Sequence, residues 1–469
     1  MINKYKKILI LFSNFILFSG IIYSLIILII SVKKIYSLYD QEIYTIQYIF
    51  LFFSLAFLFF FVFAFKFQTE HKINISILLF SIGLTLFSVE IFLNFNWFPP
   101  KERYQVAEEM GIPYDRRTVS EVIDDFKNQN IESYPNIIPA EFVDNNLMKN
   151  DNEIIFPVNG ISNVLTIVGN ETGEYSVFNS DEHGFNNPKG LYQKDKIDIV
   201  LIGDSFMECC VNENETLGSV LRDLGYIAIN VGKRGNDTLI EYASLREFAK
   251  PMQPKIVLWF YYEYDIYDLT SELGSDFLNQ YLENDNFNQN LILNQSEIDQ
   301  ILIEYANKEI NKINISNFIS LIIKNFKLTN IRSLFGIAQP THSEDFIKTQ
   351  FRTIIKKAQK DVSNWGGQFY FVYLPTFNRY KDIGARYYAT SANWQNNDNL
   401  NRDFILNTIE DLNIPIIDIH KEVFEQHSDP ISLFPLRIHS HYSAEGYNLV
   451  ANTIKNRLDE DGYIPIISD

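Results

Sequence analysis

The chain is poor in cysteine, and its histidines lack the spacing of a metal site. Cys209 and Cys210 are the only two cysteines among 469 residues, and because adjacent cysteines rarely bridge, no disulfide framework is expected. None of the seven histidines forms a His-x-x-x-His pair, and no glycine-rich phosphate loop is visible. The sequence therefore predicts neither a metal centre nor a cofactor.

Positive charge is outnumbered by negative charge beyond the first hundred residues. Residues 99–469 carry 33 Lys and Arg against 54 Asp and Glu, a net charge of -21, whereas residues 1–98 carry a net charge of +3. A region this acidic repels the phosphates of nucleic acids and anionic lipid headgroups. We therefore expect no nucleic-acid partner, and a substrate that is neutral or weakly charged.

Three long runs without a charged residue lie near the N-terminus, at 8–32, 43–65 and 73–89. Each reaches or approaches the ~20 apolar residues that cross a hydrocarbon core of ~30 Å. The sequence therefore predicts a membrane anchor over residues 1–98, with the lipid bilayer as a partner. Its three transmembrane helices are expected at about 8–32, 43–65 and 73–95.

The lysines around these runs indicate an orientation. Five lie before the first run or between the second and third, and two lie between the first and second. The positive-inside rule then favours a cytoplasmic N-terminus, so three spans place the remaining chain on the periplasmic or extracellular side. Glu90, near the end of the third run, suits the membrane interface.

Beyond a charged stretch at 99–150, expected to be a linker or packing arm, apolar runs alternate with helical segments. Continuous apolar runs separated by helices indicate a parallel sheet covered on both faces. We therefore predict a three-layer α/β/α domain over residues 151–469, with a helical insertion at about 270–345. The predicted strands are 197–202, 226–231, 255–262, 368–374 and 414–419, and the predicted helices are 216–224, 239–248, 345–365, 402–412 and 444–458.

Two short segments carry the residue types of nucleophilic catalysis. Ser205 ends the first strand of the domain in Gly203-Asp204-Ser205, and His441 precedes the last predicted helix. Ligands of such sheets bind beyond the carboxyl ends of the strands, and a histidine there can take the proton of a serine hydroxyl. Each residue alone suits a structural role at a helix start, but together they predict a Ser-His pair.

Backbone N–H groups at the same edge are the expected oxyanion donors. The N–H of Ser205 opens a helix, and Gly232 and Gly235 follow the second strand. The side chain of Asn236 is a further donor within reach of this edge.

At these residues the chain resembles the SGNH/GDSL hydrolase superfamily, over roughly residues 150–460. Gly203-Asp204-Ser205-Phe206 is similar to its first block, and His441 ahead of Ala444-Glu445-Gly446-Tyr447 is similar to its fifth. The resemblance implies a flavodoxin-like fold with Ser205 as nucleophile. Segments 180–188 and 240–247 resemble a membrane-anchored bacterial branch, which implies an inner-membrane location and ester chemistry on surface glycans.

The third block departs from the superfamily. Its usual oxyanion asparagine is replaced by Tyr264, followed by Asp265. A tyrosine hydroxyl can donate a hydrogen bond, although its reach differs from that of asparagine.

The triad acid also departs from the superfamily, which places an aspartate two or three residues before the histidine. His439 and Ile438 occupy those positions. Asp429 and Asp418 are the upstream candidates for orienting His441, Asp204 is a candidate supporting group, and a Ser-His dyad is the alternative.

These observations predict a membrane-anchored serine esterase or O-acyltransferase that acts on acyl esters of a cell-envelope glycan. A transferase would need a membrane protein as acyl donor. One alternative is a catalytically weak or inactive glycan-binding or assembly protein on the same fold. A second is a lipase, for which the anchor is the motivation.

Overall fold

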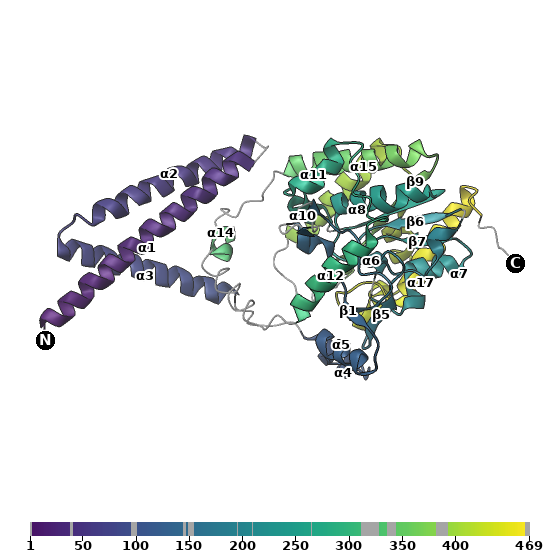
Figure 1. Ribbon diagram of the computed structural model, residues 1–469, viewed down its shortest axis with the longest axis horizontal. Coiled ribbons are helices and arrows are strands. Elements are labelled where there is room, and N and C mark those ends of the chain that lie inside the picture. Colours follow the sequence, from purple (N-terminus) through teal and green to yellow (C-terminus); the bar gives the residue numbers. More distant parts are fainter. Residues whose placement is uncertain are drawn as a thin grey trace. The chain divides into compact units, whose positions relative to one another are not determined.

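The computed structural model forms two compact units (Figure 1). The first comprises Met1–Pro99 and Lys312–Phe346, and the second comprises Pro100–Asn311 and Ile347–Asp469. The structure describes residues 2–37, 41–94, 101–143, 147–148, 154–194, 196–208, 210–263, 265–310, 328–334, 344–380 and 393–464.

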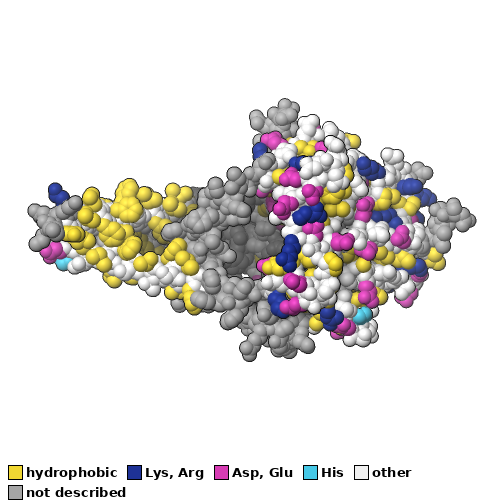
Figure 2. All heavy atoms as spheres, turned by 90° about the horizontal axis from the view of Figure 1, so that it is seen from below, with side chains coloured by type: hydrophobic (Ala, Val, Ile, Leu, Met, Phe, Trp, Pro, Cys, Tyr) yellow, Lys and Arg dark blue, Asp and Glu magenta, His cyan; other side chains and the backbone are white. Residues whose placement is uncertain are grey.

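The first unit is built from three apolar helices, α1 (Ile2–Ser37), α2 (Gln41–Ala64) and α3 (Thr69–Asn94). Segments Tyr5–Lys33 and Thr69–Leu93 are long and apolar enough to cross a membrane, whereas the described apolar part of α2 is shorter, at Tyr48–Ala64. Only 17% and 11% of the most apolar 18-residue windows of the two longer segments are buried, which weighs against core helices of a soluble fold. Figure 2 shows hydrophobic side chains covering these helices and charged ones scattered over the second unit.

A buried carboxylate joins the two segments of the chain that make up the first unit. Glu90 of α3 is fully buried, and its two carboxylate oxygens accept hydrogen bonds from the backbone N–H groups of Asn330 (2.8 Å) and Ile331 (2.9 Å). These groups lie in the first turn of α14 (Thr329–Leu334), where free N–H groups and the helix dipole favour an anion. Glu90 therefore caps a helix from the insertion.

The second unit contains a five-stranded parallel sheet in the order β10-β9-β8-β6-β7. This is the flavodoxin-like order, and it confirms the predicted fold class. β6 lies between β7 and β8, so the chain reverses its direction of travel across the sheet at the strand that precedes Ser205. The strands are β6 (Ile199–Ile202), β7 (Ala228–Asn230), β8 (Ile256–Tyr262), β9 (Gln368–Leu374) and β10 (Ile416–Asp418).

Helices cover both faces of this sheet. On one face, α7 and α17 share a buried cluster with Ile199 and Leu201 of β6. On the other, the ring of Tyr261 on β8 lies 5.5 Å from Phe351 on α15, which lies 6.4 Å from Phe404 on α16. The helices around the sheet are α6 (Ser205–Glu208), α7 (Leu217–Asp223), α8 (Thr238–Ser244), α9 (Lys250–Met252), α10 (Asp265–Glu272), α11 (Asp276–Glu283), α12 (Gln295–Ile310), α15 (Glu344–Asn364), α16 (Asn393–Asp411) and α17 (Ala444–Glu460).

The stretch expected as a linker or packing arm folds with the second unit. Thr118 caps α5 through a capping box with Glu121, and Val122 and Ile123 of α5 pack on Ile167 of a small sheet. That sheet has the order β1-β4-β5 and lies outside the five-stranded sheet. These elements are α4 (Arg103–Glu109), α5 (Val119–Asn128), β1 (Ser133–Pro135), β4 (Leu165–Asn170) and β5 (Tyr175–Asn179), with a further pair β2 (Leu147–Met148) and β3 (Ile154–Ile155).

Candidate active site

Ser205 opens helix α6 directly beyond β6. The carboxylate of Asp204 accepts a hydrogen bond from the N–H of Phe206 (2.9 Å), which fixes the tight turn between strand and helix. Gly232, at the end of β7, lies so close that an added Cβ would come within 2.7 Å of the Gly203 carbonyl oxygen. The two strand ends can therefore meet because residue 232 is a glycine.

His441 lies within hydrogen-bond distance of the nucleophile. Its Nε2 is 2.8 Å from the Oγ of Ser205. Ser443 caps α17 by accepting a hydrogen bond from the N–H of Gly446, which sets the path of the chain just after the histidine. The ring of Phe206 lies 4.7 Å from the imidazole and limits its movement.

The third member of the triad is Glu171, which the sequence did not indicate. It is the first residue after β4, and its Oε2 lies 2.9 Å from both the Nδ1 and the backbone nitrogen of His441. Burial alone raises the pKa of this carboxyl, but the charge and hydrogen bonds of His441, followed by the charge of Arg103, lower it to about 2. Glu171 is therefore ionised at neutral pH and can hold the imidazole with its Nε2 facing Ser205.

The two aspartates expected to orient His441 lie elsewhere. Asp429 forms a two-armed ion pair with Arg437 (2.7 and 2.9 Å), and Asp418 pairs with Arg402. Arginine satisfies each carboxylate locally, so the expected acid is corrected to Glu171. Of the other sequence candidates, His439 contributes its carbonyl oxygen, which accepts a hydrogen bond from Arg103 (3.2 Å).

Asp204 contacts the nucleophile as well as the turn. Its Oδ2 lies 3.2 Å from the Oγ of Ser205, so the hydroxyl has two acceptors, this carboxylate and His441. Burial raises the pKa of Asp204 above its ordinary value.

The expected oxyanion donors separate into two groups. The N–H of Gly232 donates to Oδ1 of Asn230 (2.8 Å), so the expectation that it serves the oxyanion is corrected. Gly235 has a positive φ of 77° that suits glycine, and both amide atoms of the neighbouring Asn236 are buried without a hydrogen-bond partner among the described residues. Tyr264 and the side chain of Asp265 lie outside the described residues.

Two triad residues and Cys210 have atoms with the spacing of metal ligands. Glu171, Cys210 and His441 each offer a ligand atom, and these atoms lie within 4.8 Å of one another. The carboxylate and imidazole are already joined by the triad hydrogen bond. Cys210 is not a free cysteine, so its sulfur is not a free thiolate.

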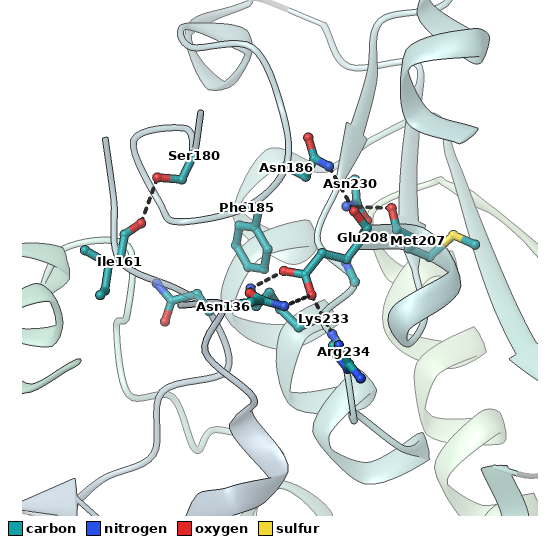
Figure 3. A network of polar contacts seen from close by, with 12 residues as sticks. Asn136, Ile161, Ser180, Phe185, Asn186, Met207, Glu208, Asn230, Lys233 and Arg234 are labelled. Atoms are coloured by element: carbon teal, nitrogen blue, oxygen red, sulfur yellow. Dashed lines mark hydrogen bonds and ion pairs between the residues drawn. The ribbon is translucent and has the colours of Figure 1, made fainter. Parts of the chain in front are cut away.

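A buried ion pair supports the turn that carries Ser205 (Figure 3). Glu208, at the end of α6, is fully buried and pairs with the buried Nζ of Lys233. Its other carboxylate oxygen accepts from the side chain of Asn136 (2.6 Å) and the N–H of Arg234 (3.0 Å). The same carboxylate thereby ties the nucleophile helix to the loop after β7.

Solved structures resemble part of the chain, whereas no family model and no curated protein matches it. A lipase/acylhydrolase from Enterococcus faecalis is 14% identical, with a TM-score of 0.33 over 56% of this chain and 96% of its own. The acetyl xylan esterase AlAXEase is 12% identical, with a TM-score of 0.32 over 56% of this chain and 100% of its own. A catalytic mutant of an acetylxylan esterase from Geobacillus stearothermophilus is 11% identical, with a TM-score of 0.31 over 58% and 97%.

Replacing the triad acid should remove most of the activity. We expect Glu171→Gln to lower the rate of ester hydrolysis by on the order of 10³–10⁴-fold, because the amide cannot stabilise a protonated imidazole and can hold the wrong tautomer. The measurement is kcat with a p-nitrophenyl ester. Asp429→Asn is the matched control and should retain wild-type kcat, and the reverse ranking of the two variants would refute Glu171 as the acid.

Breaking the buried ion pair should destabilise the second unit. Glu208→Gln leaves the ammonium of Lys233 buried without its counter-charge, which costs about 3–5 kcal/mol in comparable pairs. Thermal unfolding of the full chain in detergent should show a clear fall in the melting temperature. Glu304→Gln breaks an exposed pair with Lys308 and should change it little. Equal melting temperatures in the two variants would contradict this interpretation.

Proposed function

We propose that the chain is a membrane-anchored serine hydrolase that acts on acyl esters of a cell-envelope glycan, as an esterase or as an O-acyltransferase. The Glu171–His441–Ser205 array carries the proposal. Oε2 of Glu171 lies 2.9 Å from Nδ1 of His441, and Nε2 of His441 lies 2.8 Å from Oγ of Ser205. The array lies at the carboxyl edge of the sheet, where such folds bind ligands.

The array supports a two-step acyl transfer. The Oγ of Ser205 attacks the ester carbonyl carbon while its proton passes to Nε2 of His441. The tetrahedral intermediate collapses to an acyl-serine, and the leaving alcohol takes that proton. Water, or a sugar hydroxyl in a transferase, then attacks the acyl-serine and gives its proton to His441, which returns it to Ser205. The anionic Glu171 stabilises the imidazolium formed in both steps.

The negative oxygen of the intermediate needs hydrogen-bond donors. The backbone N–H groups of Ser205 and Gly235 and the side-chain amide of Asn236 are the groups proposed for this role. Asn236 is only 4% exposed, and both of its amide atoms lack a partner among the described residues, which leaves the amide available to a bound ester. Tyr264 is a further donor, proposed from its place in the sequence.

The cellular setting follows from the first unit and from the sequence. Two helices of membrane-spanning length and the lysine distribution support a multi-pass anchor in a bacterial inner membrane, with the second unit on the periplasmic or extracellular side. The glycan substrate rests on the resemblance of segments 180–188 and 240–247 to membrane-anchored relatives. Transfer rather than hydrolysis would require a membrane partner that supplies the acyl group.

A fluorophosphonate probe tests the proposed function on the full chain in detergent. Wild type should become labelled, and labelling should be lost in Ser205→Ala and reduced in His441→Ala, because the probe reports an activated serine. Ser219→Ala, a serine on α7, should label like wild type. Absence of labelling in folded wild type would refute hydrolysis and leave the glycan-binding role. Labelled enzyme would next be assayed for acetate release from acetylated glycans and for fatty-acid release from phospholipid vesicles, which separates the esterase from the lipase.

A further inference from the structure

Arg103, on α4, the first helix of the second unit, contacts the triad at Glu171. Its Nη2 lies 2.8 Å from Oε1 of Glu171 and 3.2 Å from the carbonyl oxygen of His439. One guanidinium nitrogen therefore connects the hairpin that carries the acid with the segment that leads into His441. Arg103 lies only four positions after Pro99, which ends the N-terminal segment of the first unit.

The two oxygens of Glu171 have separate partners. Oε2 accepts from the backbone N–H and the ring Nδ1 of His441, and Oε1 accepts from the guanidinium of Arg103. A carboxylate held on both oxygens cannot turn about its terminal bond without losing a charge-assisted hydrogen bond. The guanidinium thus fixes the plane in which the carboxylate meets the imidazole.

Neighbouring residues hold the same hairpin. The hydroxyl of Tyr114 donates to the carbonyl oxygen of Asn170 (3.0 Å), and the side chain of Asn170 donates to the carbonyl oxygen of Asp115 (3.0 Å). Gly173, with a φ of 119°, approaches so closely that an added Cβ would lie 2.4 Å from the Pro113 carbonyl oxygen. The segment after α4 therefore clamps the turn that places Glu171.

We propose that Arg103 is a positioning residue for the triad acid, so that α4, the helix that follows the membrane anchor in the sequence, completes the catalytic site. This inference rests on the proposed hydrolase function. Arg103 does not touch the reacting atoms; it acts through Glu171, by holding its carboxylate in place and by favouring its charged form.

The electrostatic part of this role gives a distinctive readout. Arg103 lowers the pKa of Glu171 through its charge, and Glu171 is coupled to His441. Loss of that charge therefore favours protonation of the Glu171–His441 pair as a whole, so the protonated pair forms at a higher pH and activity falls earlier on acidification. The other titratable groups that face Glu171 are His441, His439, Tyr114 and Tyr447, and none of the variants below except Tyr114→Phe changes them. If Arg103 acted only through structure, its loss would lower the rate without moving the acid limb, the acidic side of the pH–rate profile.

The experiment compares pH–rate profiles of the full chain in detergent with a p-nitrophenyl ester. Arg103→Gln should lower kcat by about 10- to 100-fold, in the range expected for a misplaced catalytic group, and should shift the acid limb to higher pH. Arg103→Lys, which keeps the charge, should restore the limb and much of the rate. Arg116→Gln removes an arginine from the same arm, where it pairs with the exposed Glu108, and should match wild type.

Tyr114→Phe separates positioning of the hairpin from charge. It loses the hydrogen bond to Asn170 but no cation, so it should leave the acid limb in place. An Arg103→Gln profile with wild-type kcat and limb would overturn the role of Arg103, as would a limb shift that Lys fails to reverse.

Fluorophosphonate labelling distinguishes the two levels of the inference. Labelling of wild type together with slow labelling of Arg103→Gln supports both. Equal labelling rates overturn the role of Arg103 alone, and no labelling of folded wild type overturns the hydrolase function and this inference with it.

Discussion

The site depends on the contact between Glu171 and His441. One carboxylate oxygen accepts both the ring and the backbone N–H of the histidine, so a single group fixes the imidazole and the chain that carries it. The five-stranded sheet supplies the nucleophile, but the acid comes from a hairpin of the small sheet β1-β4-β5. The five-stranded sheet is therefore insufficient on its own, and the small sheet that precedes β6 in the sequence belongs to the candidate site.

The central sheet and two triad members can be predicted from the sequence because their signals are local. Strands buried on both faces read as continuous apolar runs, and the predicted fourth strand coincides with β9. Ser205 falls where a strand ends and a helix begins, and His441 lies just ahead of the last helix. Glu171 lacks such a signal, since it lies 270 positions before His441, in a turn where an acidic residue is ordinarily a surface group. Asp429, only 12 positions before the histidine, is the natural candidate from sequence, but Arg437 binds it.

Buried polar groups around the nucleophile could not be assigned from sequence either. Gly232 matches the pattern of an oxyanion donor, yet its N–H serves the side chain of Asn230. Glu208 and Lys233 read as surface residues of a helix and a loop, but they are buried against each other. These outcomes depend on which strand ends approach one another in space, which residue spacing along the chain does not encode.

The triad follows the chain order Glu, Ser, His, and this order has a consequence for biosynthesis. Ribosomes release the N-terminal part first, and nearby regions can fold while later ones are still being made. Arg103 and Glu171 are therefore present before the nucleophile, and the base that activates Ser205 is made 236 residues after it. A nascent chain that already contains Ser205 still lacks His441, so the Ser–His pair is complete only when synthesis reaches the segment just before the last helix.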